Sequence, residues 1–167
     1  MASLSKHHVA LAGEFAVLSQ LALRGFDANM TLGNTKSVDI LISNPRTGKM
    51  RRLEVKTHSH NREYLSKECG RVVGQWRMAD KHESIRDKDL FYCFVTIEND
   101  TGGFRFYVVP SNVVADFITK SHQYWLAGKE TRNDNPMRSF QIGLDRKGYP
   151  MTLPNAEDYR NRWDLLE

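Results

Sequence analysis

The chain has 167 residues, of which 26% are charged and 40% hydrophobic, and its formal net charge at pH 7 is +4. This length predicts a single domain over residues 1–167, with enough chain to bury a proper core. No apolar run approaches the ~20 residues that cross a bilayer, the N-terminus lacks the apolar stretch of a secretory signal, and two cysteines do not make a disulfide framework. We therefore expect a cytoplasmic protein with no membrane partner.

Residues 8–24 are predicted to form an amphipathic helix that ends near Gly25. Its apolar stripe consists of Leu11, Leu18 and Leu21, widened by Phe15 and Ala22. Glu14 lies on this stripe, where a carboxylate is costly unless it has a partner. Two interpretations stay open here. Glu14 either reaches solvent or an arginine from the stripe edge, or it belongs to a buried site.

A short strand over residues 26–32 and a turn at Gly33-Asn34 are expected next, followed by a β-hairpin. The hairpin strands are 37–42 and 52–57, around a stretch rich in turn formers. The register that centres this turn pairs Asn44 with Lys49, Ile40 with Leu53, and Asp39 with Glu54. One face is then apolar and consists of Val38, Ile40, Ile42, Leu53 and Val55.

The other hairpin face carries Asp39 directly across from Glu54, with Lys56 two residues further on. Opposed positions have Cβ atoms about 5 Å apart. Two carboxylates that close repel each other unless a proton or a cation lies between them, and a hard divalent cation such as Mg²⁺ prefers oxygen ligands. A surface salt bridge between Lys56 and its acidic neighbours is the alternative, and it leaves Asp39 less well explained.

The rest of the chain is predicted as alternating strands and helices. The expected elements are an irregular loop over the site at 58–74, a helix at about 72–85, strands at 90–98 and 104–110 joined by a turn at 99–103, a helix at 111–126, a loop at 128–137, a strand at 140–144 and a helix at 155–166 with Tyr159 and Trp163 on one face. This order indicates an α/β or α+β domain with a mixed central sheet flanked by helices. Residues 128–167 would be a C-terminal addition of unknown role.

Basic residues concentrate between positions 46 and 88, around the predicted carboxylate pair. The residues expected to contact nucleic acid are Arg51, Arg52, His58, Arg62 and Arg71. A basic surface beside acidic metal ligands suits a phosphodiester substrate. Each single lysine or arginine is equally well explained as solvated surface.

The motif Asp39 … Glu54-Val55-Lys56 resembles the signature of the PD-(D/E)XK nuclease superfamily, which has the restriction-endonuclease-like fold. Val38 stands where the signature has a proline, and Glu14 matches a glutamate that the family often carries on its first helix. The arrangement is most similar to that of the archaeal Holliday-junction resolvases. The likeness covers residues 8–57 in motif and 58–110 in topology alone.

The resemblance implies a metal-dependent endonuclease that hydrolyses phosphodiester bonds in DNA, either branched or duplex. Mg²⁺, with Mn²⁺ as a substitute, would be bound by Asp39, Glu54 and the main-chain carbonyl of Val55. Lys56 would stabilise the attacking hydroxide or the charge on the phosphate, and Glu14 would join through an outer-shell water or a second metal. Gln75, on the helix predicted at 72–85, would orient the nucleophile or a phosphate, or is an ordinary residue of the helix surface.

Two other functions remain open. The same scaffold could bind nucleic acid without cutting it, or the chain could be a partner-binding module that uses its C-terminal helix as the contact. Because cutting both strands of a duplex or junction takes two sites, a two-fold homodimer is expected for the nuclease.

Overall fold

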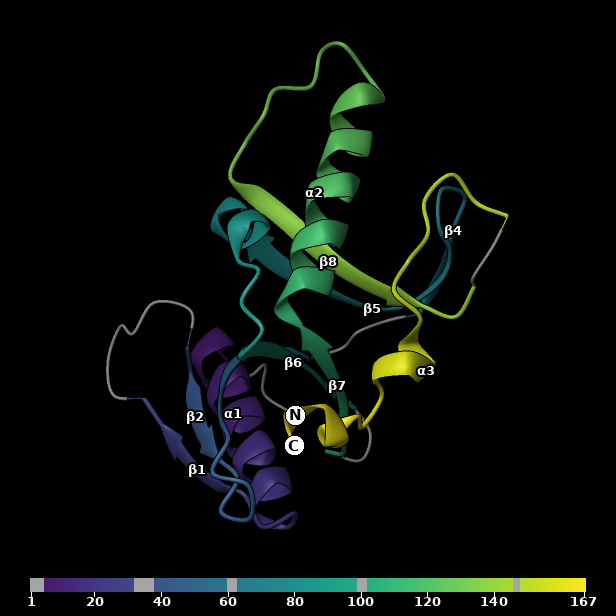
Figure 1. The fold of residues 1–167 in the computed structure, drawn as a ribbon. Helices are drawn as coiled ribbons and strands as arrows, with labels where there is room; N and C mark the ends of the chain where they lie inside the picture. The colour runs from purple at the N-terminus through teal and green to yellow at the C-terminus, as the bar shows by residue number, and fades with distance from the viewer. Residues whose placement is uncertain (1–4, 32–37, 60–62, 99–101, 146–147) are drawn as a thin grey trace.

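The computed structural model describes residues 5–31, 38–59, 63–98, 102–145 and 148–167, and it contains two β-sheets with helices packed on them (Figure 1). The elements are α1 (Lys6–Ala22), β1 (Asp27–Met30), β2 (Ile40–Ser43), β3 (Met50–Ser59), β4 (Tyr64–Ser66), β5 (Gly70–Ala79), η1 (Asp80–Ser84), β6 (Leu90–Ile97), β7 (Phe104–Pro110), α2 (Ser111–Ala127), β8 (Met137–Gly143), α3 (Ala156–Tyr159) and η2 (Trp163–Leu166). The turn predicted at Gly33-Asn34 lies outside the described residues. None of the described helices is long and apolar enough to cross a membrane.

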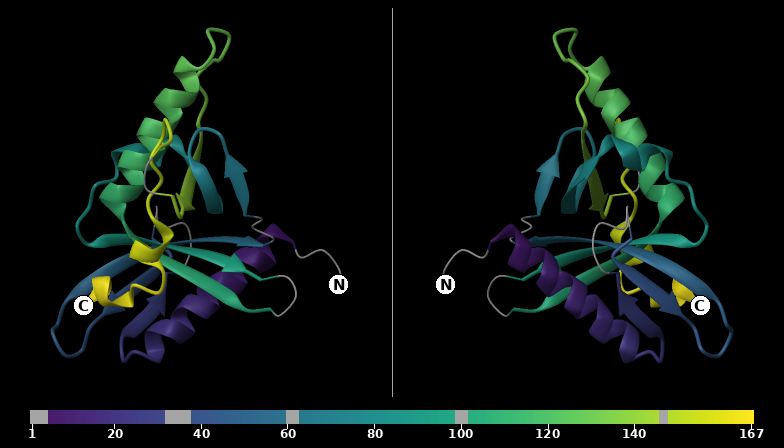
Figure 2. Two further views of the ribbon diagram at one scale, coloured as in Figure 1. Left: turned by 90° about the vertical axis from the view of Figure 1, so that its right-hand side faces the viewer. Right: turned by 90° about the vertical axis from the view of Figure 1, so that its left-hand side faces the viewer.

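The first sheet has five strands in the order β1-β2-β3-β6-β7. β3 and β6 are parallel, whereas the other neighbouring pairs are antiparallel. Figure 2 shows α1 lying along one side of this sheet. The expected α+β domain with a mixed central sheet is therefore confirmed.

The hairpin of β2 and β3 has the predicted register. Ile40 pairs with Leu53, and the Asn44 amide donates to the Lys49 carbonyl at 2.9 Å. The predicted apolar face is buried throughout, because its five side chains, Val38, Ile40, Ile42, Leu53 and Val55, are each at most 8% exposed. This burial fixes the register, because a slip of one residue would place the charged face in the core.

Helix α1 buries a different stripe from the predicted one. Its buried residues are Val9, Gly13, Val17 and Leu21. Leu11 and Leu18 are half-buried, while Phe15 and Ala22 are exposed. The prediction followed the larger apolar side chains, but the helix packs against β3 through Gly13, which has no side chain to keep them apart. Glu14 follows Gly13 and is half-buried.

The second sheet has the order β4-β5-β8, and it corrects the loop expected at 58–74 and the helix expected at 72–85. In β5 the buried side chains of Trp76 and Met78 alternate with the more exposed Gln75 and Arg77, which is the period of a strand. Gly74 disfavours a helix, and a Cβ there would lie 2.3 Å from the Trp76 ring. The sequence before residue 74 does not alternate between polar and apolar residues, so it gave no sign of a strand there.

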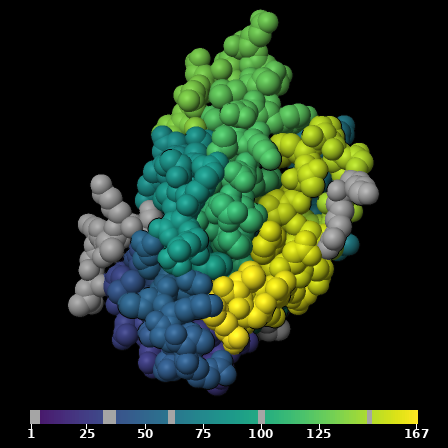
Figure 3. Space-filling view, in the orientation of Figure 1, coloured from purple at the N-terminus to yellow at the C-terminus, as the bar shows by residue number. Residues whose placement is uncertain are grey.

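The C-terminal segment is not one helix. The chain leaves α3 at Arg160, which forms a β-bridge with Tyr107, and Asn161 has φ 53° before η2 begins. Tyr159 packs against the hydrophobic cluster between the two sheets, whereas Trp163 belongs to the cluster between the first sheet and α1, so the two side chains do not share a face. In the space-filling view of Figure 3 this segment, in yellow, runs down one side of the molecule from the α2 region to the first sheet.

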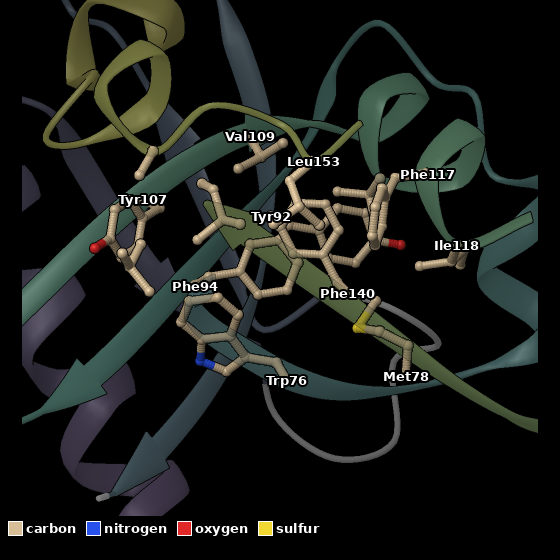
Figure 4. Close-up of a cluster of buried hydrophobic side chains, with 14 of the residues drawn as sticks. Trp76, Met78, Tyr92, Phe94, Tyr107, Val109, Phe117, Ile118, Phe140 and Leu153 are labelled. Carbon is tan, nitrogen blue, oxygen red and sulfur yellow. The ribbon is translucent and has the colours of Figure 1, made fainter. Parts of the chain in front are cut away.

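The two sheets share an aromatic core, which Figure 4 shows in close-up. Phe94 of β6 stacks on Phe140 of β8 with ring centroids 4.2 Å apart, and Trp76 lies 4.9 Å from Phe94. The Trp76 indole N–H donates to the Val95 carbonyl at 3.0 Å. These contacts attach β5 to β6 and fix the second sheet relative to the first.

Candidate functional site

Asp39 lies within electrostatic reach of Glu54, although the β2–β3 pairing begins one residue later, at Ile40 and Leu53. The Asp39 amide donates to the Leu53 carbonyl at 2.8 Å, and the Asp39 carboxylate accepts from the Val55 amide at 2.7 Å. Asp39 itself lies just before β2. Backbone hydrogen bonds of β3 thus hold this carboxylate beside Glu54.

Glu54 is a buried carboxylate, only 3% exposed. One of its oxygens, Oε1, lies 2.5 Å from the Lys56 ammonium. The other, Oε2, is buried and has no hydrogen-bond partner among the described residues. A buried carboxylate oxygen without a donor is costly, so this atom is suited to accept a cation or a proton.

His82 lies beneath Glu54, and the sequence did not point to it. Its Nδ1 is 3.6 Å from Glu54 Oε2 and 2.8 Å from the Tyr92 hydroxyl, and the ring is 2% exposed. Burial lowers the pKa of His82 and raises the pKa of Tyr92, so both are neutral at pH 7. His82 stands in a run of charged residues, which gave no signal that its side chain turns inward.

Tyr92→Phe is expected to lower the free energy of unfolding by about 1 kcal/mol, because the buried His82 nitrogen loses its partner. Chemical denaturation measures the change. Tyr124→Phe is the matched control, because Tyr124 is 43% exposed and should change stability little. Equal effects of the two substitutions would show that the buried pair contributes nothing.

Glu14 joins the carboxylates from helix α1 because of the glycine before it. A Cβ on Gly13 would lie 1.8 Å from Thr57 Oγ1, so only glycine lets the helix approach β3 this closely. Burial raises the pKa of Glu14, and the charge of Asp39 raises it further. Glu14 thus lies within electrostatic reach of Asp39 and Lys56, and Asp39 lies within electrostatic reach of Glu54.

The electrostatics of the site favour a bound cation. Burial raises the pKa of Asp39 above its ordinary value, the charge of Glu54 adds to this, and Lys56 and Lys81 oppose it. Within the described ranges no group of three or more His, Cys, Asp or Glu side chains is arranged to hold a metal ion. Mg²⁺ does not require one, since it commonly binds through one or two carboxylates and keeps several waters. The two carboxylates of Asp39 and Glu54, the latter with Oε2 lacking a hydrogen-bond partner, fit that donor set.

The raised pKa of Asp39 predicts how stability depends on pH. The native state holds this proton more tightly than the unfolded state does, so the free energy of unfolding falls as pH rises from the ordinary carboxyl range through the raised pKa. Without metal, Asp39→Asn should therefore be more stable than wild type at neutral pH, and the difference should vanish in acid. Melting temperatures between about pH 4 and pH 8, with a chelator present, measure this.

Glu130→Gln, on the exposed loop after α2, is the control for a surface carboxylate. A metal-free Asp39→Asn protein that melts below wild type at neutral pH would contradict the account of this site.

The other predicted site residues have partners elsewhere in the fold. Gln75 is on strand β5 and not on a helix, and it hydrogen-bonds to Tyr64 and Ser139 at 2.9 and 2.8 Å. Three of the predicted phosphate contacts are in ion pairs: Arg51 with Asp89, Arg52 with Asp87, and Arg71 with Glu63. Arg62 lies outside the described residues.

A hollow of about 520 Å³ opens beside Lys56. His58 lines it together with two basic residues that were not among the predicted contacts, Lys6 of α1 and Arg77 of β5. Among the residues that the structure describes, none that lines the hollow is acidic. The basic side chains of this hollow and the carboxylates of the hairpin therefore lie on neighbouring surfaces.

Comparisons with family models and with curated proteins each gave no match. Among solved structures, the chain is similar to a bacterial homing endonuclease, I-Ssp6803I, with a TM-score of 0.53 and 16% identity over 98% of this chain and 93% of that one. The Holliday junction resolvase Hjc of the archaeal hyperthermophile Archaeoglobus fulgidus is matched with a TM-score of 0.41 and 16% identity, over 78% of this chain and 81% of that one. At this identity the first likeness bears on the fold alone, and the second is too low in TM-score to carry an argument.

Proposed function

We propose that this chain, which has the restriction-endonuclease-like fold, is a metal-dependent endonuclease that hydrolyses phosphodiester bonds in DNA. One observation carries the proposal. The buried Glu54 has an oxygen without a hydrogen-bond partner, it lies within electrostatic reach of Asp39, and it has Lys56 beside it. The similarity in fold to a protein described as a homing endonuclease supports DNA as the substrate.

Each residue of the site has a proposed role. Asp39, Glu54 and the Val55 carbonyl would hold Mg²⁺, for which Mn²⁺ would substitute. The bound ion supplies a Lewis acid that polarises the scissile phosphate and lowers the pKa of a bound water. Lys56 stabilises the negative charge that develops on the phosphate, and Glu14 orients an outer-shell water.

The DNA backbone is proposed to lie along the basic hollow. Lys6, His58 and Arg77 line this hollow, which supports phosphate contacts there. Of the contacts predicted from sequence, Arg51, Arg52 and Arg71 already have carboxylate partners, so we expect them to contribute less. Arg62 follows His58 along the chain and remains a proposed contact.

The expected location is the cytoplasm, which agrees with the two free and buried cysteines, Cys69 and Cys93. A two-fold homodimer is the assembly we expect if both strands are cut. Branched and duplex DNA are the substrates to compare. Residues 128–167 are proposed to belong to the same domain, because β8 completes the second sheet.

Incubation of the protein with linear, nicked, single-stranded and four-way-junction DNA tests the proposal. Cleavage is expected with Mg²⁺ or Mn²⁺ and not with a chelator. If none of these substrates is cut while salt-sensitive binding is retained, the proposal of an active enzyme fails.

The alternative function is a protein that binds nucleic acid without cutting it. The ion pair between Lys56 and Glu54 favours it, because the ammonium already neutralises part of the carboxylate charge. A direct measurement of Mn²⁺ affinity separates the two functions, since the inactive scaffold needs no metal.

A further inference from the structure

Strands β5 and β8 extend beyond β4 as a two-stranded antiparallel ribbon. β4 pairs only with Gly70–Val72, whereas the pairing of β5 with β8 continues to Ala79 and Met137. Beyond β4, no third strand among the described residues pairs with the β5 side of the ribbon. A two-stranded ribbon of this kind fits the major groove of B-form DNA, which is about 12 Å wide.

The ribbon has one buried face and one uncovered face. Trp76, Met78 and Phe140 point into the core, on the side where α2 packs. Figure 2 shows α2 on that side of the second sheet. At the borders of the other face, Ser139 and Gln141 line a hollow shared with α2, and Arg77 lines one shared with the first turn of α1. The uncovered face carries Gln75, Arg77, Ser139 and Gln141, where Gln75 pairs with Gln141 and Arg77 pairs with Ser139.

Hydrogen bonds hold the polar side chains of this face in place. The Tyr64 hydroxyl donates to Gln75 Oε1 at 2.9 Å and accepts from Gln141 Nε2 at 2.7 Å. Gln75 Nε2 donates to Ser139 Oγ at 2.8 Å. Both ends of the Gln75 amide are thus engaged within the protein. A network that fixes amide orientation before a ligand arrives lowers the entropic cost of binding.

The face lies next to the proposed cleavage site. Arg77 lines the hollow that Lys56 and His58 also line, so the β5 edge of the ribbon adjoins β3. None of the outward positions at Gln75, Arg77, Ala79, Met137, Ser139 and Gln141 is acidic. A face with neutral hydrogen-bonding groups, bordered by cations, complements base edges flanked by phosphates.

We propose that the uncovered face of the β5–β8 ribbon reads base edges in the major groove of duplex DNA, next to the cleavage site. The inference rests on the proposed function for its substrate. Outward side chains on one strand are about 6.7 Å apart, close to two base-pair steps. RNA fits less well, because the major groove of its A-form helix is too deep and narrow for side chains to read.

Two residues of the face have the chemistry of base readers. The Gln141 amide offers a donor and an acceptor side by side, which match N7 and the amino group of adenine. The Arg77 guanidinium matches O6 and N7 of guanine. Gln75 and Tyr64 act as positioning residues, because their hydrogen bonds orient Gln141 and Ser139.

Selection of bound duplexes from a randomised pool tests the proposal, with the Asp39→Asn protein as the parent so that cleavage does not intervene. A preference at a few adjacent base pairs is expected. Gln141→Ala should reduce discrimination at one of them by roughly 10-fold to 100-fold. Gln141→Glu replaces the amide that donates to the Tyr64 hydroxyl with an acceptor, and it should shift the preference there from adenine to cytosine. Arg77→Lys keeps the charge and should lose a guanine preference.

Gln123→Ala, at an exposed position of α2, is the matched control and should leave the selected sequences unchanged. A wild-type face without base preference, or a preference that survives both Gln141→Glu and Arg77→Lys, would overturn the inference. A parallel cleavage assay keeps the two proposals apart. Selective binding without cleavage contradicts the proposed enzyme alone. Cleavage with a base preference that the ribbon substitutions do not change contradicts this inference alone.

Discussion

Asp39→Asn and Glu54→Gln are each expected to lower the rate of metal-dependent DNA cleavage by about 10³-fold. The metal's stabilisation of transition-state charge is worth several kcal/mol, and each 1.36 kcal/mol is tenfold in rate. Both substitutions keep the shape of the side chain, and an asparagine oxygen can still accept from the Val55 amide. Single-turnover cleavage at saturating Mg²⁺ measures the loss.

Two further variants make this result specific. Glu130→Gln removes an exposed carboxylate far along the chain from the hairpin and should cut at the wild-type rate. Lys56→Met removes the ammonium beside Glu54 and should slow the reaction by roughly 10²-fold without weakening metal binding. Cleavage that survives both Asp39→Asn and Glu54→Gln would show that the site lies elsewhere.

Gly13→Ala is expected to destabilise the protein by about 2 kcal/mol, although alanine is the better helix former by about 1 kcal/mol. The added Cβ would lie 1.8 Å from Thr57 Oγ1, so α1 must move away from β3. That movement carries Glu14 away from Asp39, and a displacement of about 1 Å can cost roughly 10²-fold in rate. Chemical denaturation and cleavage rates are both measured.

A double-mutant cycle isolates the contact between α1 and β3. In a Thr57→Gly background the clash is absent, so adding Gly13→Ala should no longer destabilise the protein. Ala10→Gly, at an exposed position of the same helix, should show the opposite preference and lose about 1 kcal/mol. An equal cost of Gly13→Ala in both backgrounds would mean that the helix does not depend on this close approach.

The hairpin could be predicted because local signals agree in it. The alternation of apolar residues and the stretch rich in turn formers together favour one register. Ile40 pairs with Leu53 as expected. The restriction-endonuclease-like fold that the motif Asp39 … Glu54-Val55-Lys56 indicated is confirmed. The site residues proposed from that motif remain a prediction that cleavage assays have to test.

The second sheet could not be predicted, because its strands depend on partners far along the chain. β5 pairs with β8, more than sixty residues later, as in the pair Gln75 and Gln141. His82 could not be found for a related reason. Its burial follows from packing against Tyr92 and Glu54, and nothing in its charged neighbours indicates it. Such non-local contacts override local propensity.

The account depends most directly on a cation between Asp39 and Glu54. Crystals soaked in Mn²⁺ and measured at an anomalous wavelength test it in one measurement. The predicted result is a peak within bonding distance of both carboxylates, with Glu54 Oε2 among its ligands. The account would be contradicted if no anomalous peak lies beside Glu54 at saturating Mn²⁺ and its carboxylate contacts only Lys56 and His82.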